Sequence, residues 1–234
     1  MVDFSLENWM ANLSPVIAKR TLIELYIPGS HNSAINEDCL TTHYPFPFPQ
    51  FPTAIGPDAP DAILKIPRVI PVSLFIGSII RAWGVTQKLS FHDQLLKGIR
   101  YFDLRITKVS GKFKFTHTLV SYTDIFILLS PVESFMREHD KEVLILDCQH
   151  FYDMNDAGCD QLLDGFHSLF GDLLCTSDEI NISQALFETY IKRNKRVLLI
   201  WKTDYANKLS SRNRSLVYKR EEALESEWAS IVQI

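Results

Sequence analysis

Two histidines and one arginine are the residues of this sequence whose types and surroundings could do chemistry. His31 lies in the stretch IPGSHNS, His117 in FTHT, and Arg105 at the end of GIRYFDLR. One imidazole can take a proton while the other gives one, because histidine titrates near neutral pH. A guanidinium can hold two phosphate oxygens at once and stabilise developing negative charge. Together these groups are sufficient to cleave a phosphodiester without a metal ion.

The segments around the two histidines predict that both lie at the ends of strands. Leu22–Ile27 is predicted as a strand before His31, and Lys112–Thr116 as a strand before His117. Residues just beyond the carboxyl ends of strands face the ligand crevice of α/β sheets and barrels. A turn histidine bonded to a backbone carbonyl explains His31 as well as catalysis does, and a half-buried strand position explains His117 better when it is taken alone. As a pair on one face they favour acid–base catalysis.

Two acidic residues accompany them near the ends of predicted strands. Asp103 and Arg105 are two apart in the predicted strand Ile99–Ile106, so their side chains point to the same face. They are either a phosphate-binding pair or an ordinary salt bridge. Asp147 ends the apolar strand Glu142–Asp147, where it could bind a substrate hydroxyl, hold a cation or, slightly favoured, cap the next turn. The fixed charge of Arg105 disfavours a metal ion beside these carboxylates.

The other predicted elements alternate between helices and buried strands. They are helices from Ser90 to Gly98, from Ser130 to about His139, over Asp156–Phe170 and over Ser183–Arg193, and a strand over Val197–Trp201. This alternation predicts an α/β fold with a parallel sheet, open or closed into a barrel.

Three regions depart from that pattern. His43–Pro60 is rich in proline and is predicted as an extended loop, whose aromatic residues Phe46, Phe48 and Phe51 could touch a membrane or, as the favoured alternative, pack over the fold. Val69–Ile80 is too short to span a bilayer and is predicted as a core helix. Ser210–Ile234 is charged and weakly helical without a strand signal, so we divide the chain into a catalytic domain over 1–209 and a tail over 210–234.

The composition is that of an ordinary soluble globular protein. The 234 residues are 46% hydrophobic, and a net charge of −4 without a basic run argues against a nucleic-acid partner. The four cysteines have neither zinc nor disulfide spacing, and the acidic N-terminus lacks the features of a secretory signal. We therefore expect a reduced cytoplasmic protein with buried thiols.

The motifs resemble the X region of phosphatidylinositol-specific phospholipase C, and above all the X-domain-only proteins of animals. The resemblance spans about Ser5 to Tyr205 and rests on NWMANL, IPGSHNS, GIRYFDLRI, His117 and KEVLILDCQHFY. It implies a TIM-like (β/α) barrel and a phosphoric diester hydrolase or lyase acting on phosphatidylinositol-type lipids, with diacylglycerol and a cyclic inositol phosphate as products. The implied partners are the phosphoinositide substrate and, transiently, a peripheral membrane surface.

The resemblance also implies a role for each site residue. His31 would be the base on the inositol 2-hydroxyl, His117 the acid that protonates the departing diacylglycerol oxygen, and Asp103 the acidic residue that contacts the reactive hydroxyl. Arg105 falls where metal-dependent members carry a calcium-binding acid and bacterial metal-independent members carry arginine, so no calcium or other cofactor is expected. The implied substrate-binding residues are Asn32, Asp147 and Lys202.

Two features depart from the pattern of that family. Asn32 stands where bacterial and many X-domain-only members have aspartate, and an amide orients a neighbour without supplying charge, which would lower activity. Only five convincing strands are predicted where a closed barrel needs eight, and the sequence after Asp204 lacks the expected later ones. The barrel is therefore expected to be incomplete at its C-terminal side.

Two other functions stay open. A shortened, catalytically inactive family member could bind lipid headgroups or a partner, and the missing strands support this alternative. A glycerophosphodiester phosphodiesterase is also a barrel with two histidines, but it would need a set of acidic metal ligands that the sequence does not offer.

Overall fold

The computed structural model describes residues 5–40, 55–65 and 82–224. The predicted core helix Val69–Ile80 and the aromatic residues Phe46, Phe48 and Phe51 lie outside these ranges. Within the described ranges no helix combines the length and the apolarity needed to cross a bilayer.

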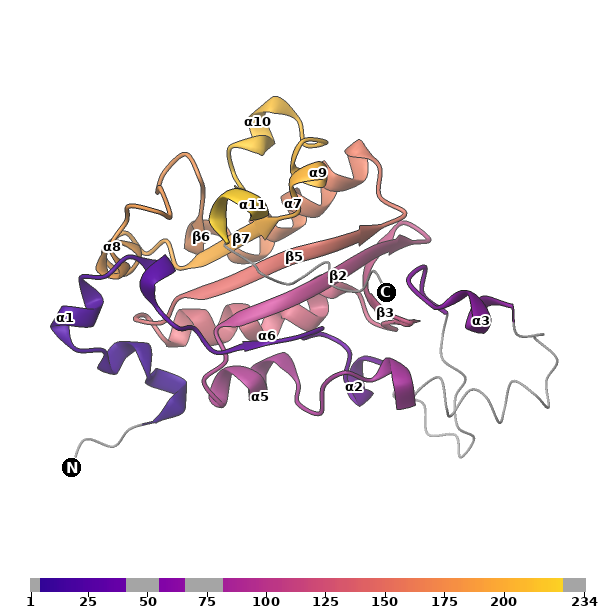
Figure 1. Ribbon diagram of the computed structural model, residues 1–234, viewed down its shortest axis with the longest axis horizontal. Helices are drawn as coiled ribbons and strands as arrows, with labels where there is room; N and C mark the ends of the chain where they lie inside the picture. Colours follow the sequence, from indigo (N-terminus) through magenta and orange to yellow (C-terminus); the bar gives the residue numbers. More distant parts are fainter. Residues whose placement is uncertain (1–4, 41–54, 66–81, 225–234) are drawn as a thin grey trace, which may run out of the picture.

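One sheet of parallel strands forms the centre of the described structure (Figure 1). Its main strands lie in the order β1, β2, β5, β7 and β8, and each pairs in parallel with the next. Their bounds are β1 Gly29–Ser30, β2 Tyr101–Val109, β5 Leu144–Tyr152, β7 Val197–Trp201 and β8 Tyr218–Lys219. The sheet does not close on itself within the described residues, because β1 pairs only with β2 and β8 only with β7.

Three short strands complete the sheet at its two sides. β3 (Lys112–His117) runs antiparallel to the second half of β2, and β4 (Leu119–Val120) folds back on β3. β6 (Leu174–Cys175) pairs with the first half of β7, whereas β8 pairs with its second half. The predicted strands at Lys112–Thr116 and Val197–Trp201 are thereby confirmed.

The two faces of the sheet bury separate apolar clusters. One cluster joins the outward side chains of β2, β5 and β7 to the helices α5 (Phe91–Leu96), α6 (Ile125–Glu138) and α7 (Asp156–Phe170). The other joins the opposite face to the N-terminal segment, through Met10 and Leu22, and to α8 (Phe187–Lys192). Figure 1 shows α1 (Pro15–Ala18) beside the amino ends of the strands and α3 (Asp61–Leu64) beyond their carboxyl ends.

Side-chain alternation makes the second face polar toward the carboxyl ends of the strands. Tyr101, Ile145 and Leu198 form one row across the sheet, and all belong to the same apolar cluster. In the next row toward the carboxyl ends, Asp103 is paired with Asp147. Because residues two apart on a strand share a face, the carboxylates sit directly above an apolar floor.

The predicted strand Leu22–Ile27 is wrong. Leu22–Glu24 is a short 3₁₀ helix, and the strand that precedes His31 is limited to Gly29–Ser30. The carboxylate of Glu24 accepts hydrogen bonds from the backbone N–H and the hydroxyl of Thr21, at 2.8 and 2.9 Å, and this capping box closes the turn.

Two predicted helix starts also need correction. α6 begins at Ile125, five residues before Ser130, so that Pro131 lies inside the helix. Its N-cap is Asp124, which accepts a hydrogen bond from the N–H of Phe126 at 3.0 Å. Because Pro131 has no N–H, the carbonyl of Ile127 lacks its hydrogen bond within the helix. The Ile127 side chain is exposed, so water can donate a hydrogen bond to this carbonyl instead. α8 begins at Phe187 rather than at Ser183.

The tail holds a strand that its sequence did not indicate. Tyr218–Lys219 adds β8 to the sheet, and the hydroxyl of Tyr218 donates to the carbonyl of Ile180 at 2.8 Å. The short helices α9 (Thr203–Ala206), α10 (Ser211–Arg214) and α11 (Arg220–Ala223) flank it. The helix over Asp156–Phe170 and the burial of all four thiols are confirmed, while the division at residue 209 stays a prediction.

Candidate active site

His31 follows β1 and is held by the carboxylate of Asp103. Its Nδ1 lies 2.9 Å from Asp103 Oδ2, which also accepts the N–H of Asn32 at 2.9 Å. Since an ionised carboxylate only accepts hydrogen bonds, Nδ1 carries the proton of the neutral ring and Nε2 keeps its lone pair. Half of the His31 side chain is exposed (53%), so this lone pair belongs to a reachable base.

β1 and the turn after it lie close against β2. A Cβ on Gly29 would meet the ring of Tyr101 at 2.9 Å, so only glycine fits there. Asn32 adopts the left-handed conformation with a φ of 47°, which asparagine tolerates better than most residues. The hydroxyl of Ser33 accepts the N–H of Asp103 at 2.9 Å and ties the turn to β2.

Arg105 lies on β2 opposite His150 of β5. The pairing of the two strands shifts between Leu104 and Arg105, so that Gln149 is an extra residue on β5. This irregularity brings His150, rather than its predecessor, opposite Arg105. Burial lowers the pKa of His150, and the charges of Arg105 and Lys202 lower it further. The ring of His150 is therefore neutral at neutral pH and lies near the positive charges of Arg105 and Lys202.

Asp147 is fully buried beside Asp103 and holds several donors on one oxygen. Its Oδ2 accepts hydrogen bonds from the Tyr101 hydroxyl, from Gln149 Nε2 at 3.0 Å and from Arg220 Nε at 3.0 Å. Burial raises the pKa of Asp147 in spite of the Tyr101 hydrogen bond and the Arg220 charge, which both lower it.

His117 is set at the end of β3 by two loop residues. Its Nδ1 lies 3.2 Å from the carbonyl oxygen of Gly84. Asp58 accepts the hydroxyl of Thr116 at 2.8 Å and the N–H of Thr118 at 3.0 Å, so it holds the backbone on both sides of the histidine.

Asp58 also connects the end of β3 with the arginine. Burial raises the pKa of Tyr152, the charge of Asp58 raises it further, and the charge and hydrogen bond of Arg105 oppose both. Arg105 is thus within hydrogen-bond reach of the Tyr152 hydroxyl, and the charge of Asp58 acts on the same hydroxyl. Through Asp58 and Tyr152 the His117 segment is linked to the arginine.

Buried polar atoms without partners gather in this neighbourhood. Within the described ranges they include Asn32 Oδ1, Asp103 Oδ1, Asp147 Oδ1 and Arg105 Nε. Buried polar atoms in proteins are almost always hydrogen-bonded, so a group of them indicates a place for a polar ligand. A hollow of about 180 Å³ opens beside His31, between Asp103, Tyr101 and Gln149.

Most of the predicted site residues lie where the sequence placed them. His31 and Asn32 follow β1, and Lys202 directly follows β7, with its N–H on the carbonyl of Cys148 at 3.1 Å. Asp103 and Arg105 lie inside β2 and Asp147 lies inside β5, so the prediction that Asp147 ends its strand is wrong, because the strand continues to Tyr152. His117 reaches the group through the Gly84 and Asp58 contacts.

Four further residues contribute to the site but were not predicted from the sequence: Tyr101, Gln149, Arg220 and Asp58. Tyr101 could have been found, because it is two residues before Asp103 and so shares its face. His150 stacks on the ring of Tyr152, with the ring centroids 6.2 Å apart, and is also exposed to the charges of the site.

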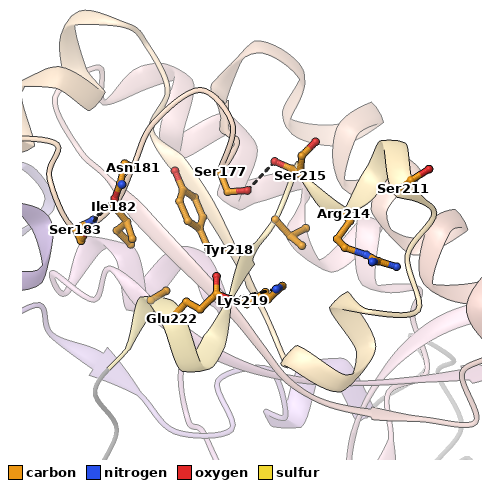
Figure 2. A pocket seen from close by; sticks show the side chains of 12 residues that line it. Ser177, Asn181, Ile182, Ser183, Ser211, Arg214, Ser215, Tyr218, Lys219 and Glu222 are labelled. Carbon is orange, nitrogen blue, oxygen red and sulfur yellow. Dashed lines mark hydrogen bonds and ion pairs between the residues drawn. The ribbon is translucent and has the colours of Figure 1, made fainter.

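A larger cavity lies elsewhere, around β8. It measures about 580 Å³ and is lined by Tyr218, Lys219 and Glu222 together with several serines (Figure 2). Figure 2 shows Ser177 bonded to Ser215, whose carbonyl accepts the hydroxyl at 2.7 Å. The lining contains no histidine, and its carboxylate, Glu222, is ion-paired with Lys219 at 3.1 Å, so the His31 hollow remains the candidate active site.

Several known proteins are similar to this chain in sequence. No family model matches the chain. Human PI-PLC X domain-containing protein 2 is 31% identical over 198 residues, which cover 83% of this chain and 59% of that protein. Mouse PI-PLC X domain-containing protein 3 is 30% identical over 177 residues, covering 74% and 51%. This chain belongs to the PI-PLC X domain-containing family. It spans half to three fifths of the length of these curated relatives.

Solved structures of phosphatidylinositol-specific phospholipase C from Staphylococcus aureus share the fold of this PI-PLC X domain-containing chain. One has a TM-score of 0.53 at 16% identity and covers 96% of this chain and 60% of that one. A second has a TM-score of 0.54 at 14% identity, with 97% and 62% covered. The fold is therefore a TIM-like α/β barrel, and within the described residues its strands leave it open, as predicted.

Proposed function

We propose that this chain cleaves the phosphodiester of phosphatidylinositol-type lipids by metal-independent acid–base catalysis, releasing diacylglycerol and a cyclic inositol phosphate. The observation that carries the proposal is the His31–Asp103 contact, because it places the proton of the neutral ring on Nδ1 beside a hollow that both residues line, and because Asp103 keeps a second, unpartnered oxygen. The family relationship and the shared fold support it.

The first half of the reaction is attack by an internal hydroxyl. His31 Nε2 takes the proton of the inositol 2-hydroxyl, and the freed oxygen forms a bond to phosphorus. Asp103 keeps Nδ1–H in place and stabilises the imidazolium that results. The guanidinium of Arg105 binds the phosphate oxygens, on which negative charge grows.

The second half is departure of the lipid oxygen. As the bond from phosphorus to the glycerol oxygen breaks, the protonated ring of His117 donates a proton from Nε2, and diacylglycerol leaves. His31 then carries the proton taken from inositol, and His117 is left neutral. Proton exchange with water returns both rings to their starting states, so the cycle balances without a cofactor.

The charges of the site favour a mechanism without calcium. Asn32, Asp103 and Asp147 offer oxygen ligands, but Asp147 is already bound to Arg220 at 3.0 Å. The second guanidinium, Arg105, lies on the same strand as Asp103. Two fixed positive charges beside three oxygen donors oppose the binding of a divalent cation.

The remaining residues suit the polyol part of the substrate. The unpartnered oxygens of Asn32 and Asp147 can accept hydrogen bonds from the hydroxyls of the inositol ring. Lys202 is close enough to this site for its charge to act on His150. With this substrate the protein works at a membrane surface, as a cytoplasmic protein in peripheral contact with the bilayer.

The test is cleavage of phosphatidylinositol vesicles in EDTA, followed by release of cyclic inositol phosphate. We expect activity in wild type and a loss of about 100-fold or more in His31→Ala, His117→Ala and Arg105→Ala. The matched control is His92→Ala, since His92 is an exposed residue of α5 on the other side of the sheet.

Two other outcomes would replace the proposal. Turnover only with added divalent metal would indicate a calcium-dependent lipase or a glycerophosphodiester phosphodiesterase. No turnover, either in this chain or in one extended by the strands that close the barrel in its relatives, would indicate an inactive protein that binds headgroups or a partner.

A further inference from the structure

Residues Gly84–Gln87 run between the two histidines, and we call this segment the strap. We propose that the strap sets the distance between base and acid, and that the carbonyl of Gly84 is the orienting partner of His117. This inference rests on the proposed function and adds positioning residues to it.

One end of the strap is tied to the turn that carries His31. Gln87 Nε2 donates to the carbonyl of His31 at 2.7 Å, and the hydroxyl of Thr86 donates to the carbonyl of Asn32 at 2.7 Å. These carbonyls flank the left-handed residue of the turn. The two hydrogen bonds therefore fix the peptide units from which the His31 ring projects.

The other end is tied to His117. A carbonyl only accepts hydrogen bonds, so the Gly84 contact places the proton of the neutral His117 ring on Nδ1. Nε2 is then the atom that is protonated for catalysis and that gives its proton to the leaving oxygen. His31 is oriented by a charged carboxylate, whereas His117 is oriented by a neutral carbonyl.

The strap is short and fixed in its middle. The N–H groups of Thr86 and Gln87 both donate to the carbonyl of Ile35, at 2.9 and 3.0 Å. Gly84 and Gln87 are three Cα–Cα steps apart along the chain, so their Cα atoms are at most about 11 Å apart. The anchors of the two imidazoles therefore keep a bounded separation.

Gly84 can hold this position because it has no side chain. A Cβ there would lie 2.8 Å from Leu119 Cδ1 and 2.9 Å from its Cγ, with the carbonyl oxygen of His117 at 3.4 Å. Leu119 is fully buried, so the packing around it opposes a shift of its side chain. An alanine at residue 84 must consequently push the strap away from His117.

The experiment compares two substrates in Gly84→Ala. Phosphatidylinositol has an alkoxide leaving group that needs the acid, while an inositol nitrophenyl phosphodiester has a leaving group that departs without protonation. We expect Gly84→Ala to lose about 10- to 100-fold in kcat on the lipid and less than about twofold on the nitrophenyl substrate. Equal losses on both substrates would overturn the role of the Gly84 carbonyl.

Two further variants separate positioning from general damage. Leu119→Ala in the Gly84→Ala background makes room for the new methyl group and should restore most of the lipid activity, while Leu119→Ala alone keeps the ratio of the two rates. Gln87→Ala acts on the base, so it should lower both rates together and should cause no further loss in the His31→Ala background. A failure of this rescue, or a selective loss on one substrate in Gln87→Ala, would contradict the strap.

A readout without turnover distinguishes this proposal from the proposed function. The ¹⁵N spectrum of the imidazoles, assigned with His117→Gln, should show His117 protonated on Nδ1 in wild type and a mixture of tautomers in Gly84→Ala. If the chain is inactive but His117 gives the expected spectrum, the positioning role of the strap is supported and the proposed lipase activity is contradicted. If His117 is protonated on Nε2 instead, the strap is wrong whatever the activity.

Discussion

Asp103 and Asp147 are opposed in register on adjacent parallel strands, yet their carboxylates are bound to different kinds of partner. Asp103 holds an imidazole and a backbone N–H on one oxygen, whereas Asp147 holds a tyrosine, an amide and a guanidinium. Each keeps its other oxygen buried and without a hydrogen bond among the described residues. One row of the sheet thus supplies both a partner for a base and an acceptor for a ligand.

Replacing the partner of His31 should damage catalysis more than stability. Asp103→Asn offers an amide that can donate to Nδ1, which favours the wrong tautomer and removes the charge that stabilises the imidazolium. We expect kcat to fall by about 100-fold or more, as for orienting carboxylates in other histidine sites. Vesicle hydrolysis measures it, and Asp164→Asn on exposed α7 is the control. Full activity in Asp103→Asn would show that another group orients the base.

Removing Arg220 should destabilise the protein, because it leaves the Asp147 carboxylate with neutral donors only. Arg220 is 19% exposed on its side chain and Asp147 is fully buried. We expect Arg220→Met to lower the free energy of unfolding by about 1–3 kcal/mol, less than for a wholly buried pair. Urea unfolding at neutral pH measures this change, with the exposed Arg212→Met as control. An unchanged midpoint would mean that the pair contributes nothing to stability.

His150 should make the protein less stable as the pH falls. Its pKa is lowered in the folded state, by burial first and then by Arg105 and Lys202, so the unfolded chain binds the proton more tightly. Stability is fully present above the unfolded value near 6.5 and is lost as the pH falls toward the folded value, by at most about 1.4 kcal/mol per pH unit.

Urea unfolding of wild type and His150→Gln between pH 7 and 4.5 tests this expectation. The wild type should lose stability relative to the variant over that range. His167, whose pKa is also lowered by burial, is present in both proteins and cancels in the difference. Parallel curves for the two proteins would contradict the assignment.

Breaking the ion pair between Arg100 and Glu142 should destabilise the protein near the amino ends of β2 and β5. Both side chains are fully buried, with Nε and Oε2 2.8 Å apart, and they also hold the N-terminal segment through Ala11 N–H at 3.0 Å and the carbonyl of Glu7 at 2.6 Å. We expect Glu142→Ala to cost about 3–5 kcal/mol, since it leaves a buried guanidinium unpaired. The exposed pair of Glu188 and Lys192 gives the control, Glu188→Ala, with a cost of at most about 1 kcal/mol. Similar costs for the two variants would argue that Arg100 finds another partner.

The positions at which the sequence predicted the fold well are those governed by local periodicity. The apolar run Val197–Trp201 was predicted as a buried strand and the amphipathic segment Asp156–Phe170 as a helix, and the structure has both. In the same way, the spacing of Asp103 and Arg105 fixed their common face before any coordinates were known. Strand alternation depends on neighbours in the sequence, so the sequence alone determined it, whereas the capping pattern at Ser130 placed the start of α6 too late.

Contacts between distant segments were decided by the tertiary structure alone. Arg220 meets Asp147 only because β8 adds to the sheet, and nothing in the charged sequence around Tyr218 signals a strand. The extra residue Gln149 turns His150 toward Arg105, and the strap joins residues more than fifty positions apart. Such contacts depend on which edge of the sheet is free and on the register in which strands pair. That information is distributed over the whole chain, and no local pattern contains it.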